Sequence, residues 1–278
     1  MAIGALPRVL AMRYVQPLRE GGSLPAVVET DDGLYVVKFR GAGQGPRALV
    51  AEVLVWLIAE VLGLPVPPLA LVDLPPPFGR SEPDPEIQDL LRGSHGLNVG
   101  LRYLDGAFNF DATAAGDVIT PEFAARLVWL DALVTNPDRT HRNPNLLVWN
   151  RRPWLIDHGA ALYIHHDWPS ATAERVRSPF QLIAGHVLLA RSDGLEHVDA
   201  DLAAVLAGDK LRAIVDLVPD GLLTAPELER EGGPPMHRAR YYEYLTARLE
   251  APRAFHSAAV KAREALRRSI PRARSARR

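Results

Sequence analysis

The chain has 278 residues, 47% of them hydrophobic, and is long enough to bury a sizeable core in one domain or in two lobes. It contains no cysteine, which excludes disulfides, zinc–thiolate sites and a thiol nucleophile and fits the reducing cytoplasm. The formal net charge is only −1, no apolar run is suited to span a bilayer, and the first residues lack the features of a secretory leader, so we expect a cytoplasmic protein.

Strand signals come first along the chain. Residues 26–30 and 34–39 are apolar segments separated by Asp-Asp-Gly at 31–33, which predicts a β-hairpin whose first strand is the first of the chain. Residues 47–62 then carry apolar side chains at helical spacing, and Gly63 marks the end of that helix.

Two further strands are predicted at residues 69–74 and 97–104. The stretch 75–91 between them is rich in proline and acidic residues and favours a surface loop. Thr-Pro at 120–121 has the signature of a helix N-terminus, so we expect a helix from there towards Val134.

Helical spacing recurs over the remainder of the chain, at residues 178–190, 200–206, 209–217, 225–230 and 238–249. Strands therefore crowd the first third and helices follow, which predicts an α+β chain with two lobes. We expect an N-terminal lobe over 1–104 with a small sheet and one helix, a helical C-terminal lobe over 105–260, and a basic C-terminal tail over 261–278.

The tail at 261–278 holds eight basic residues against one acidic residue. A run of positive charge can tether a chain to nucleic acid or to a membrane surface, but no aromatic residues are interleaved with these charges. A solvated, frayed tail is the favoured interpretation. Neither a nucleic-acid partner nor membrane insertion is expected.

The most informative stretch of the chain is 136–162. Asp138 precedes Asn143 by five residues, and an apolar run then leads to Asp157 in an Asp-His-Gly motif. Protein kinases space the Asp and Asn of their catalytic loop in this way and follow them with a metal-binding Asp-x-Gly. The pattern predicts an ATP-dependent phosphotransferase. Asp138 would orient the acceptor hydroxyl and accept its proton, and Asn143 and Asp157 would bind Mg²⁺.

Two positions in this loop have alternative interpretations. Asn145 competes with Asn143 for the metal, although the five-residue offset favours Asn143. Arg139 is a candidate catalytic residue that either contacts phosphate or braces the loop, and the sequence does not separate these roles. Asp138 alone would be interpreted as a turn residue, and only its company makes it a candidate base.

Lys38 is the candidate phosphate-binding lysine. It lies in an apolar strand, where a lysine needs an opposite charge or a path to water. Glu52 on the following helix is the expected partner, while Glu60 lies two turns further along. The alternative places Lys38 on the solvent face of its hairpin.

Other candidates are weaker. Gly21, Gly22 and Ser23 precede the first expected strand and could bring backbone N–H groups and a hydroxyl to a phosphate, or form a plain turn. Tyr103 lies where a connector between lobes could contact adenine. The histidines at 158, 165 and 166 are interpreted as surface residues and not as a metal cluster.

With these residues identified, the chain resembles the HipA-like kinases over about residues 15–170. The likeness rests on Asn-Pro-Asp-Arg at 136–139 with Asn143, on Leu-Ile-Asp-His-Gly-Ala at 155–160, and on the helix of Glu52 with its Gly-Leu-Pro-Val-Pro exit at 63–67.

The resemblance implies a protein-kinase-like fold, ATP with Mg²⁺ as cofactors, and phosphorylation of Ser or Thr. It also implies Asp138 as the base, Asn143 and Asp157 as metal ligands and Lys38 as the phosphate lysine. Two departures stand out: Thr140 occupies a position where many members have histidine, and the metal motif is Asp-His-Gly. No antitoxin partner is inferred, because the chain is shorter than the toxin members.

Three functions remain open on the sequence. The first is a kinase acting on a protein hydroxyl, including its own. The second is a small-molecule kinase similar to aminoglycoside phosphotransferases, with an acceptor pocket built by the helices after Trp168. The third is a nucleotide-binding pseudokinase.

Overall fold

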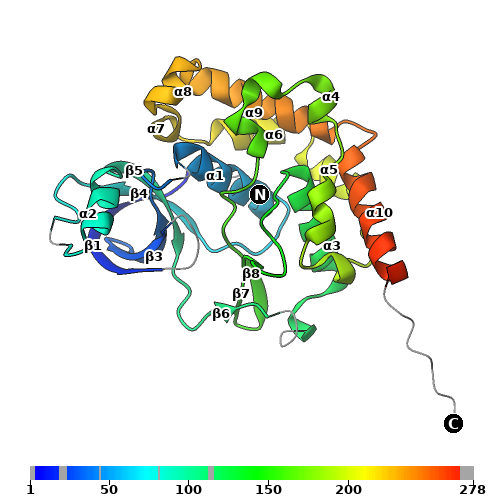
Figure 1. Ribbon diagram of the computed structural model, residues 1–278, viewed down its shortest axis with the longest axis horizontal. Coiled ribbons are helices and arrows are strands. Elements are labelled where there is room, and N and C mark those ends of the chain that lie inside the picture. Colours follow the sequence, from blue (N-terminus) through cyan, green and yellow to red (C-terminus); the bar gives the residue numbers. More distant parts are fainter. Residues whose placement is uncertain (1–3, 19–23, 44, 81, 112–115, 270–278) are drawn as a thin grey trace, which may run out of the picture.

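The computed structural model describes residues 4–18, 24–43, 45–80, 82–111 and 116–269. A small β-barrel lies at one end of the molecule and helices make up most of the rest (Figure 1). The chain is therefore a mixed α+β protein with a small sheet region and a helical region, as predicted. None of the helices in the described ranges combines the length and apolar character that a membrane crossing requires.

The barrel strands are β1 (Arg8–Pro17), β2 (Ala26–Thr30), β3 (Gly33–Lys38), β4 (Leu69–Leu74) and β5 (Gly96–Arg102). They close in the order β1-β2-β3-β5-β4, with β1 parallel to β4 and the other neighbours antiparallel. The predicted β2–β3 hairpin is confirmed, with Gly33 at φ +105°. β1 was not expected, so the prediction that the hairpin opens the chain is wrong.

Helices α1 (Gly45–Val61) and α2 (Pro85–Arg92) belong to this first part of the chain. α1 confirms the predicted helix and is buried on nearly every side, as expected for a helix that is apolar all round. It packs against β5 and against helices from the second half of the chain. The predicted loop at 75–91 is partly wrong, because α2 begins at Pro85 behind an Asp84 cap whose Oδ1 accepts from Glu86 N at 3.0 Å.

The longer helices of the second half are α3 (Pro121–Leu133), α5 (Asp199–Leu206), α6 (Asp209–Asp216), α9 (Gly233–Leu249) and α10 (Ala254–Ser269). The shorter ones are α4 (Ala173–Val176), α7 (Asp220–Leu223) and α8 (Pro226–Arg230). Single 3₁₀ turns occupy Gly116–Val118, Tyr163–His166, Trp168–Ser170, Gln181–Gly185 and Leu189–Arg191.

Two expectations for the second half need correction. The helix expected at 178–190 is replaced by two separate 3₁₀ turns. Residues 261–269, assigned to the basic tail, continue α10, where Arg263 is buried and pairs with Glu196 at 3.0 Å. The other predicted helices, including the cap of α3 by Thr120, are confirmed.

A second, three-stranded sheet holds the centre of the molecule. It consists of β6 (Phe108–Asn109), β7 (Leu146–Trp149) and β8 (Arg152–Leu155), with β7 in the middle. α3 delivers the chain into the loop at 134–145, and the β7–β8 hairpin then returns it to Asp157. This order brings the loop and the Asp-His-Gly motif to the same side of the small sheet.

The interior is divided between two hydrophobic cores. The smaller one fills the barrel with inward side chains such as Tyr35, Val37 and Val72. The larger one contains the buried face of α1, the outward side chains of β4 and β5, and the buried helices of the second half. β4 and β5 therefore face one core on each side, and α1 is packed with the helices and not with the barrel interior.

Candidate active site

Lys38 lies on the outer face of the barrel at the end of β3. Tyr35 and Val37 point into the barrel, so strand alternation directs Lys38 outward, towards α1. Its Nζ lies 2.8 Å from Glu52 Oε2 and 2.5 Å from Asp157 Oδ1. Burial alone would lower the pKa of Lys38, but the two carboxylates outweigh it and raise the pKa above its ordinary value.

Glu52 links the lysine to the Asp-His-Gly motif. The side chain is completely buried in α1, and its Oε2 also accepts a hydrogen bond from the His158 backbone N at 2.8 Å. Glu60 is exposed further along α1 and takes no part in this contact. Of the two glutamates considered from the sequence, Glu52 is therefore the partner of Lys38.

Asp157 adopts an unusual backbone conformation just after β8. Its φ of +56° is in the left-handed region, which is costly for a residue other than glycine and is concentrated at functional sites. Burial would raise the pKa of its carboxyl, but Lys38 lowers it below the ordinary value. The carboxylate therefore stays ionised at neutral pH while its side chain remains about one third exposed.

Asp138 lies at the centre of the loop before β7. Its Oδ2 accepts hydrogen bonds from Asn143 Nδ2 at 2.8 Å and from Asn145 Nδ2 at 3.0 Å. The backbone of the loop closes on itself through Thr140 N, which donates to Asn143 O at 3.0 Å. Both candidate asparagines thus contact the carboxylate. Asn143 is exposed, whereas Asn145 is buried and its carbonyl accepts from Ile156 N.

Arg139 points into the protein and not towards an open face. Its Nε donates to Asp131 Oδ2 at 2.6 Å, and its Nη1 donates to the carbonyl of Asn145. Its Nη2 lies 3.3 Å from His158 Nδ1, and the residue is only 1% exposed. Of the two roles considered, phosphate contact does not match this placement. The guanidinium joins α3, the loop and the Asp-His-Gly motif.

His158 and His165 correct the expectation of surface histidines, because both are completely buried. Burial lowers the pKa of His158 to about 4, with Arg139 acting in the same direction and Glu52 opposing it. His158 is therefore neutral at pH 7 and can accept from Arg139. Within the described ranges, no group of three or more histidine and acidic side chains forms a metal cluster.

The comparisons with known proteins follow this geometry. A model of the HipA-like kinase family matches residues 12–221, well over half of the sequence. The chain belongs to the HipA-like kinase family. A comparison with curated protein sequences gives no match. Among solved structures, the chain is similar to the crystal structure of the Helicobacter pylori proinflammatory kinase CtkA, with a TM-score of 0.57 and 14% identity over 92% of this chain and 99% of that one.

Family membership confirms the resemblance described from the sequence and identifies the protein as a HipA-like kinase. The match reaches Gly221, further than the region over which the sequence motifs extend. It thus includes the 3₁₀ segments, α5 and α6 that follow the Asp-His-Gly motif. At 14% identity, the similarity to CtkA concerns the fold alone.

Some predicted residues of this HipA-like kinase are not brought into the cluster. Gly21, Gly22 and Ser23 lie outside the described residues, between β1 and β2. Tyr103 directly follows β5, where its backbone N donates to Leu34 O at 2.9 Å and its ring is exposed. Both assignments stay predictions.

Asp131 is the residue that sequence reasoning missed. Its fully buried carboxylate accepts from Arg139 and from Asn136 Nδ2 at 3.0 Å, and lies 3.0 Å from His186 Nε2. Burial would raise its pKa, but Arg139 and His186 lower it far below the ordinary value. A lone aspartate within the apolar helix α3 was an available signal, because a buried charge needs partners.

Proposed function

We propose that this HipA-like kinase is an ATP- and Mg²⁺-dependent phosphotransferase that acts on a Ser or Thr hydroxyl of a protein, including its own chain. The observation that carries the proposal is the contact of one lysine with two carboxylates, Lys38 with Glu52 and Asp157. Protein kinases need a strand lysine paired with a helix glutamate and a metal-binding aspartate at the same time.

The donor set fits the proposed cofactors. Mg²⁺ prefers oxygen ligands and retains several waters, so one carboxylate and one amide from the protein suffice beside the phosphates. Asp157 and Asn143 offer such oxygens from partly or fully exposed side chains. When bound, Mg²⁺ would neutralise the negative charge of the triphosphate.

The remaining roles follow from position. Asp138 orients the acceptor hydroxyl and accepts its proton, while Lys38 contacts the α- and β-phosphates. Gly21, Gly22 and Ser23 cover the phosphates from the β1–β2 connection, and Tyr103 contacts adenine. Arg139 acts indirectly, by holding the loop that carries Asp138.

We also propose that the barrel with α1 is the N-terminal lobe of a protein-kinase-like fold and the helical region its C-terminal lobe, with the protein acting in the cytoplasm. The location of Lys38 supports the lobe assignment, because it faces Asp157 across the boundary between the two hydrophobic cores.

Two measurements test the function. The melting temperature should rise with ATP and Mg²⁺ together, and Asp157→Asn should remove the Mg²⁺-dependent part of that rise. Asp89→Asn is the matched control, because Asp89 is an exposed aspartate on α2 that pairs only with Arg92 in this structure. A wild-type protein with no nucleotide-dependent shift would contradict the proposal.

The second measurement follows transfer of labelled phosphate from ATP to protein. Asp138→Ala should keep the nucleotide shift but lose transfer by several orders of magnitude, because positioning and charge neutralisation supply most of the acceleration. Binding without turnover by the wild type would instead identify a pseudokinase, and transfer only to metabolites would identify a small-molecule kinase.

A further inference from the structure

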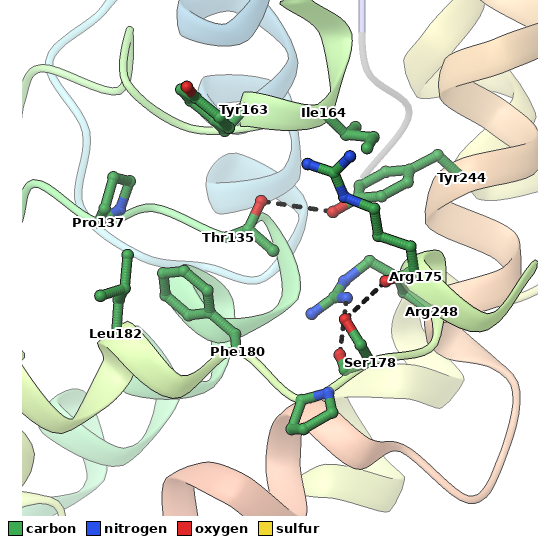
Figure 2. A pocket seen from close by; sticks show the side chains of 11 residues that line it. Thr135, Pro137, Tyr163, Ile164, Arg175, Ser178, Phe180, Leu182, Tyr244 and Arg248 are labelled. Carbon is green, nitrogen blue, oxygen red and sulfur yellow. Dashed lines mark hydrogen bonds between the residues drawn. The ribbon is translucent and has the colours of Figure 1, made fainter. Parts of the chain in front are cut away.

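A pocket of about 290 Å³ opens beside the loop that carries Asp138 (Figure 2). Pro137, the residue before Asp138, forms part of its wall, and Tyr163 contributes from the segment after the Asp-His-Gly motif. Lys38, Glu52 and Asp157 do not line it. The pocket therefore lies beside the candidate base but apart from the proposed nucleotide-binding residues.

The wall opposite the loop is held in a fixed position relative to it. Phe180 and Leu182 belong to the segment that leads into His186. There, Val187 N donates to the Arg139 carbonyl at 3.1 Å, and Thr140 forms an isolated β-bridge with His186. Anything seated between these walls is held at a defined place relative to Asp138.

One half of the pocket is apolar. Figure 2 shows Pro137, Leu182 and Phe180 together on one side, away from the polar side chains. Leu182 is 65% exposed and Tyr163 is 63% exposed, which are high values for large apolar or aromatic side chains. Exposed apolar surface at the rim of a pocket is typical of a binding site.

The other half carries positive charge. The lining contains two arginines and no carboxylate. Arg248 is committed to backbone carbonyls, including those of Leu133 and Ala132. Arg175 is 47% exposed, donates to the hydroxyl of Ser170, and has a carboxylate, that of Asp167, only at 3.9 Å. Arg175 is thus the charge most available to a ligand, and a polycationic acceptor would be repelled.

Size separates the remaining acceptors. Small-molecule pockets have volumes of roughly 300–1,000 Å³, and this one lies at the bottom of that range. It accommodates one or two side chains of an extended segment better than a whole multi-ring metabolite. The Thr135 hydroxyl and the Tyr244 hydroxyl, 3.3 Å apart, add polar groups at its back.

We infer that this pocket is a docking subsite for a polypeptide acceptor, in which Arg175 receives an acidic side chain and the Pro137–Phe180–Leu182 wall receives an apolar one. The inference rests on the proposed function and deepens it. It assigns the acceptor class as an acidic, partly apolar segment whose Ser or Thr hydroxyl lies next to Asp138. Arg175 is then a specificity-determining residue.

The test is a peptide array in which acidic, basic, apolar and neutral residues are varied around a central Ser or Thr, incubated with the full chain, ATP and Mg²⁺. Peptides that combine an acidic and an apolar residue should be phosphorylated best. Arg175→Ala should lower kcat/KM for those peptides at least tenfold, mainly through KM, and Arg175→Glu should shift the preference to basic peptides. Leu182→Ser should remove the apolar preference.

The matched control is Arg177→Ala. Arg177 is 49% exposed, lies two residues from Arg175, pairs with Glu250 and does not line the pocket. Its replacement should leave the preference unchanged. Because both arginines are about half exposed, neither replacement should unfold the chain, which a melting curve verifies.

Direct binding separates the docking site from the chemistry. A fluorescently labelled acidic–apolar peptide should bind wild type and Asp138→Asn alike, and Arg175→Ala should bind it more weakly. Binding without transfer would leave the docking site standing and contradict the proposed function. Transfer with no acidic or apolar preference, or a preference insensitive to Arg175, overturns the inference while the kinase function stands. Efficient transfer to a cationic metabolite overturns it as well.

Discussion

Three side chains converge on the buried carboxylate of Asp131, and this arrangement holds the loop that carries Asp138. Arg139 supplies a full positive charge, while Asn136 and His186 supply hydrogen bonds. A buried ion pair adds little net stability over an apolar pair, but the loss of one partner leaves an uncompensated charge in the interior. The energetic weight of Arg139 is therefore in the fold of the loop.

We expect Arg139→Met to lower the free energy of unfolding by about 3–5 kcal/mol, because the Asp131 carboxylate is then left buried without a cation. Urea unfolding measures the change. Adding Asp131→Asn to this variant should cost less than the sum of the two single changes, since the second removes the charge that the first exposes. Arg92→Met, which breaks the exposed pair with Asp89, should cost less than about 1 kcal/mol; an equally small effect at Arg139 would contradict the assignment.

His165 should make the protein sensitive to acid. Burial lowers its pKa well below the ordinary 6.5, and the neighbouring positive groups His166, Arg47 and His237 act in the same direction. The Tyr241 hydroxyl lies 2.9 Å from its Nδ1, and Glu231 faces the same cluster through Arg47. Below pH 6.5 the unfolded chain binds a proton that the folded chain does not, so stability is lost as pH falls.

His165→Gln should reduce this loss. Between pH 7 and 5 its unfolding free energy should fall less steeply than that of wild type, with a difference in slope on the order of 1 kcal/mol per pH unit. Urea titrations at several pH values give both slopes. The exposed His197→Gln serves as the control and should follow wild type. Identical slopes for His165→Gln and wild type would rule out this histidine as a source of acid sensitivity.

At the scale of single residues, the sequence was informative where spacing alone carries the chemistry. The separations among Asp138, Asn143 and Asp157 are local and survive without knowledge of the fold. The direction of a side chain is not encoded in spacing, which is why Arg139 had two open roles and the buried histidines were expected at the surface. Only long-range packing, through Asp131 and His186, determines where Arg139 points.

At the scale of elements, Gly100 shows how tightly the barrel is packed. A Cβ at this position in β5 would lie 2.8 Å from Val72 Cγ2 and 3.2 Å from Tyr35 Cβ. Gly100→Ala should therefore cost about 1–3 kcal/mol of stability from overpacking. Gly43→Ala is the matched control, because no heavy atom lies within 4 Å of its added Cβ. Denaturant unfolding compares them, and equal stability would show that the barrel can adjust.

The missed strand β1 has a physical explanation. Its outward positions include Leu10 and Met12, both exposed, so apolar residues occur on both faces and no alternation is visible. Its pairing partner β4 is more than 50 residues away, and the parallel register Arg8↔Leu71 cannot be derived from local pattern. The β2–β3 hairpin was predictable because its turn and both strands are contiguous.

At the scale of the whole molecule, Arg47 connects three segments far apart in the sequence. It lies in the first turns of α1, and its Nε donates to the His165 carbonyl at 2.7 Å while its Nη2 pairs with Glu231. Arg47 thus fastens the helix that carries Glu52 to the segment following Asp157 and to the connection before α9.

Arg47→Met should release this fastening. We expect phosphate transfer to fall about tenfold through kcat, while the nucleotide-dependent thermal shift persists, because Glu52 loses support without losing its carboxylate. Steady-state kinetics and a melting curve with nucleotide give both values. Arg13→Met removes an exposed pair with Glu29 on the barrel and should change neither. Unchanged kcat in Arg47→Met would remove this arginine from any role in positioning α1.

The order of strands and helices, and hence the α+β class, was predictable from the sequence, because periodicity is local. The closure of the barrel and the division into two cores were not, since each depends on contacts between distant segments. β4 and β5 are apolar on both faces, and only the structure shows that each face belongs to a different core.

The Lys38–Glu52 ion pair crosses the seam between those two interiors. Lys38 is carried by a strand anchored in the barrel, whereas Glu52 is carried by a helix anchored among the helices. Any swivel of one part against the other must change the separation of Nζ and Oε2 before it disturbs either interior. This one salt bridge is therefore a built-in gauge of how far the jaws of the molecule are open, and a pair of spectroscopic labels placed across it would measure closure directly.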